Sequence, residues 1–166
     1  MWQSIVFKDK YKFYNLGNYW SYEIKLDDGS WDKIQMVSVD KNDNVVGYVC
    51  ASIDRSMNKV SGMGAINFYG VNVTFAKDFY KFLTDLFEVH NFFKIEWIVV
   101  VGNPAEAIYD KIIDKYHGRV VGISHESTTL EDGKYYDVKE YEIFKRDYDK
   151  YKTRKAQKED KLSRIF

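Results

Sequence analysis

The chain has 166 residues, the length of about one domain, and 45% of them are hydrophobic and 17% aromatic. This composition supports a packed core and excludes general disorder. The 25 basic and 25 acidic residues give a formal net charge of zero, which argues against a dedicated nucleic-acid binder, so we expect no nucleic-acid partner. No apolar run approaches the ~20 residues that span a bilayer, and Cys50 is the single cysteine. We therefore expect a cytoplasmic protein without membrane contact.

The first half of the chain predicts strands separated by turns. Alternating apolar and polar residues favour strands, and clusters of Asp, Asn, Gly and Ser favour turns. Residues 33–40 and 45–53 flank Lys41-Asn42-Asp43-Asn44, which is typical of a hairpin with a four-residue loop. The predicted strands of this half are residues 4–8, 11–14, 20–26, 33–40, 45–53 and 59–68.

In the second half the hydrophobic period changes. Apolar residues recur at helical spacing over residues 75–90, and Thr74 is a candidate N-cap. The almost unbroken apolar run at residues 94–101 favours a central strand that is buried on both faces.

A second helix is predicted from Asn103 and Pro104, with Glu106 closing a capping-box-like pair, to Gly118. Residues 119–124 and 135–144 are predicted as two final strands. Antiparallel hairpins followed by a crossover helix predict an α/β (α+β) fold, with a mixed, largely antiparallel sheet flanked by helices.

Four stretches between residues 45 and 144 resemble the Gcn5-related N-acetyltransferase (GNAT) family. Residues 45–53, with Gly47 near the start, resemble a strand of that family, and residues 87–95 resemble the exit from its cofactor helix. Asn103-Pro104-Ala105-Glu106-Ala107-Ile108-Tyr109-Asp110-Lys111 and the later Gly118-Arg119-Val120-Val121-Gly122 resemble its "N…A…Y-E-K…G-F" signature. The resemblance implies a GNAT-like domain over residues 1–144, followed by a charged C-terminal helix or tail at 145–166.

This resemblance implies an acetyl-CoA-dependent N-acetyltransferase that acts directly on an amine of a small molecule or protein. In the family, a splayed strand pairs with the pantetheine arm, and backbone N–H groups that open the next helix hold the pyrophosphate. Residues 59–68 would be the splayed strand, a backbone donor near Phe68 would face the developing oxyanion, and Tyr109 would be the general acid. The implied cofactor-binding residues are Phe68, Tyr69, Asn72, Val73, Thr74 and Asn103.

The phosphate-binding loop departs from the family pattern Arg/Gln-x-x-Gly-x-Gly/Ala. Val73 and Phe75 stand where loop glycines belong, and side chains there either obstruct the phosphates or require a differently shaped loop. The N-terminal part is also dense in aromatic residues, which suits core packing or a flat interaction surface, including a homodimer contact. These features support an alternative function, a non-catalytic GNAT-fold module that binds a protein partner through this region or the charged tail.

Other polar residues carry two interpretations each. Glu96 in the predicted central strand is a candidate catalytic base or a carboxylate with an ionic partner, and Asp54 at a strand end has the same two interpretations. His90, His117 and His125 lack metal-ligand spacing, so we expect no metal site.

The tail is the one strongly basic segment. Residues 145–166 carry nine Lys/Arg and four Asp/Glu at helical spacing. A solvated helix, a helix that docks on a partner or acidic surface, and a nucleic-acid contact all fit this pattern.

Overall fold

The computed structural model describes residues 12–13, 31–130 and 132–163. The strands predicted at residues 4–8 and 20–26 lie outside this part of the chain. Lys12 and Phe13, the described part of the strand predicted at 11–14, form a turn instead. The elements are β1 (Lys33–Val39), β2 (Val45–Asp54), β3 (Lys59–Asn67), α2 (Val73–Glu88), β4 (Lys94–Val100), α3 (Glu106–Tyr116), β5 (Arg119–Thr129), β6 (Tyr135–Phe144) and α4 (Lys145–Ser163).

The six strands form one sheet in the order β1-β2-β3-β4-β6-β5. Neighbouring strands run antiparallel except β3 and β4, which are parallel. This arrangement confirms the mixed, largely antiparallel sheet and the interior position of β4. The prediction that β4 is buried on both faces was wrong, because Trp97 packs against α3 while Ile98, on the other face, is 60% exposed.

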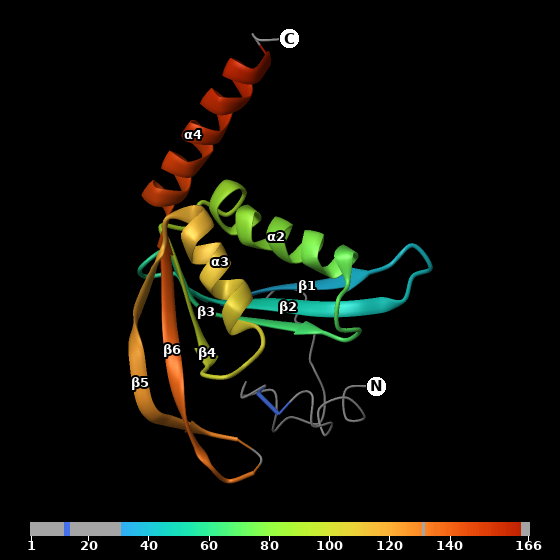
Figure 1. The fold of residues 1–166 in the computed structure, drawn as a ribbon, viewed down its shortest axis with the longest axis vertical. Helices are drawn as coiled ribbons and strands as arrows, with labels where there is room; N and C mark the ends of the chain where they lie inside the picture. The colour runs from blue at the N-terminus through green and yellow to red at the C-terminus, as the bar shows by residue number, and fades with distance from the viewer. Residues whose placement is uncertain (1–11, 14–30, 131, 164–166) are drawn as a thin grey trace.

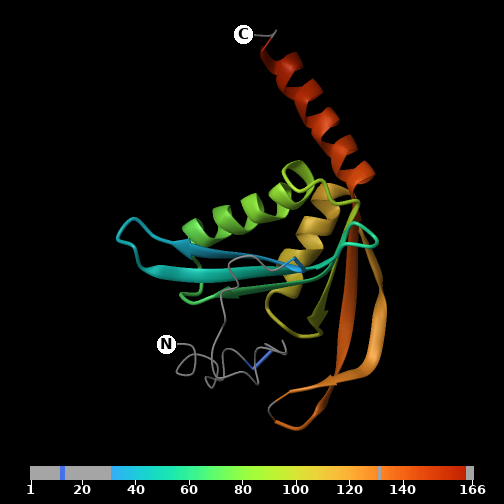
Figure 2. The same cartoon turned by 180° about the vertical axis from the view of Figure 1, so that it is seen from behind.

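Helices α2 and α3 cover the same face of the sheet, α2 over β1 to β3 and α3 over β4 to β6 (Figures 1 and 2). The buried face of α2 consists of the predicted residues Phe75, Phe79, Phe82, Leu83, Leu86 and Phe87. The predicted cap was wrong: Asn72 is the N-cap, and its side chain accepts a hydrogen bond from the N–H of Phe75 at 3.0 Å. Asn72 can cap the helix because its own backbone is extended. Thr74 lies inside the first helical turn and is therefore not the cap.

Helix α3 begins after a turn that Asn103 caps, since its side chain accepts from the N–H of Ala105 at 2.9 Å. Glu106 reaches back to the N–H of Gly102 at 3.1 Å rather than to Asn103. The helix ends before Gly118, as predicted, and its left-handed C-cap is His117, with φ 57°. Gly118 is required for packing, because a Cβ there would lie 2.7 Å from the carbonyl oxygen of Glu142 in β6.

Helix α4 continues from β6 and projects away from the sheet (Figures 1 and 2). Its first turns are anchored by Tyr148, whose ring stacks on Phe87 at 4.8 Å between centroids, and by Tyr151, which meets Tyr116 at 5.0 Å. Tyr148 is the one buried residue of this helix. Within the described residues, no helix has the length and apolar character that crossing a membrane requires.

Candidate active site

The sheet opens between β3 and β4. These strands pair only through Lys59 with Lys94 and Val60 with Ile95. Beyond those pairs β3 stays paired with β2 as far as Asn67, while β4 stays paired with β6. Each strand thus follows its outer neighbour, and the two diverge, which confirms the splayed strand predicted at residues 59–68.

Two cavities occupy this opening. The small cavity, of about 90 Å³, lies between the diverging strands and is lined by Met63, Ile98, Val138 and Asn103, among others. The large cavity, of about 330 Å³, extends toward the start of α2 and is lined by residues that include Asn67, Gly70, Val71, Asn72, Val73, Phe75 and Ile108. Ala65, Ala105 and Tyr109 line both cavities, so the two meet at these residues.

The exposed backbone of β3 faces the opening at alternate residues. The N–H of Phe68 donates to the carbonyl of Val46 in β2 at 3.1 Å. Because backbone groups alternate between the two sides of an antiparallel strand, the N–H groups of Ala65 and Asn67 point toward β4. The N–H of Phe68 itself is therefore engaged with β2, and the donors of this segment that face the opening belong to Asn67 and Ala65.

The start of α2 lies at the large cavity, which Asn72 and Val73 line. The first N–H groups of a helix have no intrahelical partner, and Asn72 satisfies that of Phe75, which leaves those of Val73 and Thr74. Gly47 lets this end of α2 approach the sheet, because a Cβ there would lie 2.1 Å from the ring of Phe75.

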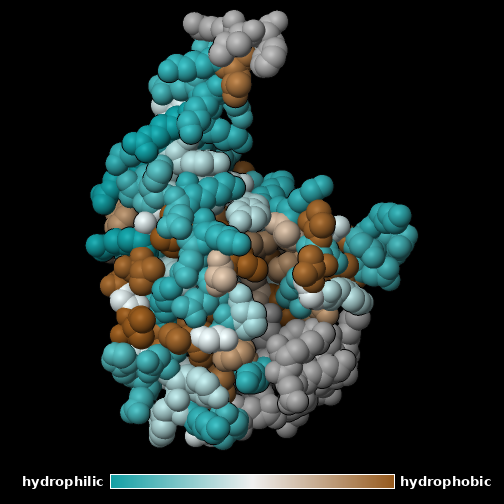
Figure 3. Space-filling view, viewed as in Figure 1, coloured by the Kyte–Doolittle hydropathy of each residue, from teal (hydrophilic) through white to brown (hydrophobic). Residues whose placement is uncertain are grey.

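The surroundings of the large cavity are apolar. Val71 and Val73 are exposed, and none of the described residues that line this cavity is Lys or Arg. Figure 3 shows hydrophobic side chains gathered around the region between α2 and α3, whereas α4 is largely hydrophilic. The predicted residues Tyr69 and Thr74 are not among those lining either cavity.

Tyr109 is held at the junction of the cavities by aromatic packing. Its ring centroid lies 5.8 Å from that of Trp97 and 6.0 Å from that of Tyr141, with edge-to-face geometry in both pairs. Tyr109 is 7% exposed. The next residue, Asp110, accepts hydrogen bonds from Lys139 at 2.7 Å and from the hydroxyl of Tyr141 at 2.9 Å. The bond from Lys139 lowers the pKa of the Asp110 carboxyl, and the pair fixes α3 against β6.

Glu96 lies away from both cavities. Its carboxylate pairs with Lys59 at 2.6 Å and also with Lys94, where β3 and β4 are still joined. Burial acts to raise the pKa of Glu96, but the hydrogen bonds from Lys59 and Lys94 outweigh it and hold the pKa below its usual range. Glu96 thus links β3 to β4 at the closed end of the opening. This position does not support a role as a catalytic base at the cavities.

Asp54, a further candidate from the sequence, also has structural partners. Asp54 accepts hydrogen bonds from the hydroxyl of Ser56 at 2.6 Å, which lowers the pKa of Asp54, and from the N–H of Met57, so it caps the turn from β2 to β3.

Across the described ranges, no three His, Cys, Asp or Glu side chains come together as a metal site. Of the aromatic N-terminal residues, Phe13 lines the small cavity and Trp31 lies exposed beneath the guanidinium of Arg55 at 4.7 Å; the others lie outside the described residues.

Neither a family model nor a curated protein matches the sequence. Among solved structures, a protein provisionally described as an acetyltransferase has a TM-score of 0.60 at 17% identity, over 76% of this chain and 64% of its own, so the chain spans less than two thirds of that neighbour. A chimera of spermidine N-acetyltransferase SpeG from Vibrio cholerae and hSSAT has a TM-score of 0.60 at 24% identity, and the match covers 70% of this chain and 69% of the chimera. Vibrio cholerae spermidine/spermine N-acetyltransferase SpeG, in complex with manganese ions, has a TM-score of 0.59 at 24% identity, and the match covers 70% of this chain and 68% of the SpeG chain. The chain has the mixed α/β fold of GNAT-like acetyltransferases.

Proposed function

We propose that this protein is an acetyl-CoA-dependent N-acetyltransferase that acts in the cytoplasm and transfers the acetyl group directly to an amine. One observation carries the proposal: Tyr109 stands where the two cavities meet, beside the unpaired edge of β3. The fold supports it, because solved structures that share this fold include N-acetyltransferases.

Three sets of polar groups among the described residues suit different parts of an acyl-CoA thioester. The N–H groups of Ala65 and Asn67 suit the amides of a pantetheine arm, which would pair with β3 as an added strand. Asn103, whose side-chain oxygen is already used by Ala105, has its amide nitrogen left to donate to the same arm. The N–H groups of Val73 and Thr74, at the positive end of the α2 dipole, suit the pyrophosphate.

In the proposed reaction the amine nitrogen attacks the thioester carbonyl carbon, and a C–N bond forms as the C–S bond breaks. The N–H of Ala65 would stabilise the negative charge that develops on the carbonyl oxygen. Tyr109 would donate its hydroxyl proton to the departing thiolate, and the proton lost by the amine would return to Tyr109 through solvent. Glu96 has no part in this scheme, because its carboxylate pairs with Lys59 and Lys94.

We do not carry spermidine over to this chain as the acceptor. A polyamine site needs carboxylates, and the residues described as lining the small cavity include none. The acceptor class in this proposal is therefore an amine of a small molecule or protein, with the amine next to an apolar group.

Calorimetry and thermal denaturation with acetyl-CoA test the proposal. A ligand at one hundred times its dissociation constant adds about 2.7 kcal/mol to the free energy of unfolding. Adenosine 3′,5′-bisphosphate, which lacks the pantetheine arm, is the matched control and should bind far more weakly. Release of free thiol with a panel of amines then measures transfer. Absence of binding by acetyl-CoA would leave the non-catalytic interaction module as the better description.

A further inference from the structure

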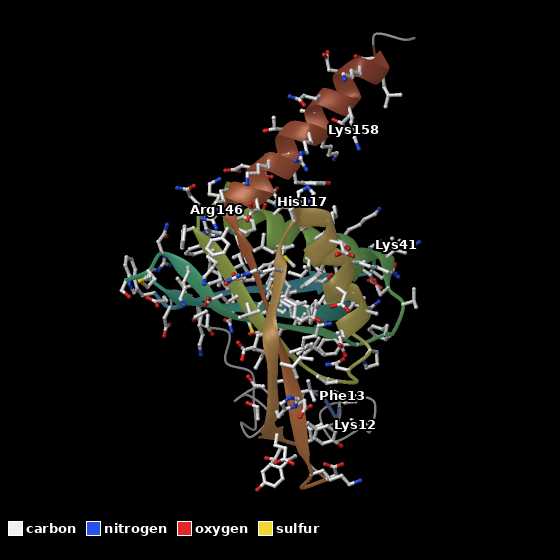
Figure 4. The ribbon with its side chains drawn as sticks, turned by 60° about the vertical axis from the view of Figure 1, so that its left-hand side comes forward. Lys12, Phe13, Lys41, His117, Arg146 and Lys158 are labelled. Carbon is white, nitrogen blue, oxygen red and sulfur yellow. The ribbon has the colours of Figure 1, made fainter. Side chains whose placement is uncertain are left out.

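A groove lined by basic side chains lies at the end of α3 that is remote from the cavities. It has a volume of about 490 Å³ and is lined by Lys115, His117, Tyr151, Arg154, Lys155, Gln157, Lys158 and Lys161. We call it the basic groove. Arg154, Lys158 and Lys161 follow one another at i, i+4 and i+7, so they form a row along one face of α4. Figure 4 shows His117 at the base of the helix and Lys158 further along it.

The cations of this row differ from those at the base of the same helix. At the base, Lys145 pairs with Asp149 at 3.1 Å, Lys150 with Asp147 at 3.0 Å and Lys152 with Glu88 at 3.0 Å. In the groove, counting the described residues, the only ion pair is the loose one between Lys155 and Glu159 at 3.8 Å.

The remaining groove cations therefore lack acidic partners in the described part of the chain. Arg154 contacts the Nε2 atom of His117 at 3.3 Å, and the ammonium of Lys115 lies over the rings of Tyr80 at 4.5 Å and Tyr116 at 4.8 Å. Like charges at i and i+4 of a helix repel each other, so the row of Arg154, Lys158 and Lys161 is unfavourable until an anion neutralises it.

We propose that the basic groove binds the sugar-phosphate backbone of a nucleic acid. A row of cations on a projecting helix matches a linear polyanion, and Lys and Arg clustered along a helix are the electrostatic pattern of phosphate binding. An acidic protein is less well matched, because Lys is depleted from protein interfaces and Tyr151 is the one aromatic anchor among the described residues that line the groove. A membrane surface would require a broad apolar helix face, which the row does not have.

This proposal departs from the expectation drawn from the net charge. A net charge of zero is a sum over the whole chain and does not record where the charges stand. The contact is electrostatic and independent of base sequence, and it does not depend on the proposed transferase activity, because it lies at the opposite end of α3 from the cavities.

The test is fluorescence anisotropy with labelled single-stranded RNA and DNA of about 20 nucleotides, over a series of salt concentrations. The informative variant is Lys158→Gln with Lys161→Gln, and the matched control is Lys41→Gln with Lys134→Gln, which removes the same charge from exposed positions outside α4. Each lost phosphate contact lowers the slope of log affinity against log salt by about 0.7 for a single strand. The slope should therefore be smaller by about 1.4 in the α4 variant than in the parent, and the variant should bind roughly 10- to 100-fold more weakly at ~50 mM salt.

The control variant should bind as the parent does, and circular dichroism should show equal helicity in all three proteins. The proposal is overturned if the parent fails to bind either oligonucleotide at low salt, or if both variants lose affinity equally. It is also overturned if polyglutamate or anionic phosphatidylserine vesicles compete as strongly as the oligonucleotide at equal charge, since the partner is then an acidic protein or a membrane surface.

Discussion

The two ends of α3 have opposite surroundings. Its first turn lies at the cavities, where Ala105 and Tyr109 meet apolar side chains and the unpaired backbone of β3. Its last turn lies at the basic groove, where Lys115 and His117 meet the cations of α4. Binding at the first end depends on shape and on backbone donors, whereas binding at the second depends on charge. Both proposed ligands are anions, so salt should weaken both, and it should weaken the second far more because several phosphates are neutralised there by side-chain cations.

The largest expected effect is at the first end, on turnover. Tyr109→Phe keeps the ring packing against Trp97 and removes the hydroxyl proton, so turnover should fall by roughly 10²- to 10⁴-fold. Thiol release with acetyl-CoA and an accepted amine measures this. Tyr116→Phe, a buried tyrosine of the same helix outside both cavities, is the control and should keep full turnover. Loss of stability with full turnover in the Tyr109 variant would make this hydroxyl structural.

The next effect separates charge from shape at the start of α2. Val73→Asp places a carboxylate beside the N–H groups proposed to hold the pyrophosphate, so calorimetry should find binding of acetyl-CoA abolished. Val73→Asn has nearly the same shape without the charge and should bind within about tenfold of the parent. Unchanged affinity in the Asp variant would place the phosphate site elsewhere.

Two glycines test whether the ends of α3 are independent. At Gly47 an added Cβ would lie 2.1 Å from the ring of Phe75, and at Gly118 it would lie 2.7 Å from the carbonyl oxygen of Glu142. Gly47→Ala and Gly118→Ala should each lower the free energy of unfolding by about 1–3 kcal/mol, measured by urea denaturation. Only Gly47→Ala should also weaken acetyl-CoA binding, because it displaces the start of α2. An equal loss of affinity in both variants would contradict the separation.

The fold followed from local patterns in the sequence, while several details of the candidate site did not. The change of hydrophobic period near residue 74 predicted α2 and β4, because periodicity reports which side of an element is buried. The cap was harder, since Asn72 and Thr74 are both good capping residues and only the backbone conformation distinguishes them. The exposure of Ile98 was missed because an apolar run does not reveal that one face of a strand lacks a covering helix.

The site residues that were missed have little side-chain signal. Ala65 contributes a backbone N–H, and whether that N–H or the one of Phe68 faces the opening depends on the register of β3 against β2. Ala105 lines both cavities through its position alone. The row of cations on α4 was visible in the sequence, but the groove also needs Lys115 and His117, which only the tertiary structure brings beside it.

The smallest expected effect concerns the middle of α3, where Asp110 joins the helix to β6. The hydrogen bond from Lys139 lowers the pKa of Asp110 below its ordinary value of 3.8. A carboxyl whose pKa is lower in the folded state stabilises that state fully above the unfolded value, and this contribution is lost as the pH falls below 3.8 and through the folded value. Because the side chain is 45% exposed, solvent screening limits the contribution to less than about 1 kcal/mol.

Asp110→Asn removes this titration and keeps the shape of the side chain. The free energy of unfolding should therefore be lower in the variant than in the parent near pH 6, and the difference should shrink as the pH falls below 3.8, where the unfolded chain takes up the proton before the folded one does. Urea denaturation at both pH values measures it, and subtracting variant from parent cancels the carboxylates they share. Asp114→Asn is the control, because it removes an exposed carboxylate from the same helix that has no ion pair among the described residues. A difference for Asp110→Asn that stays constant from pH 6 to pH 3 would show that the amide loses shape complementarity rather than charge, and the link between α3 and β6 would then rest on the hydroxyl of Tyr141.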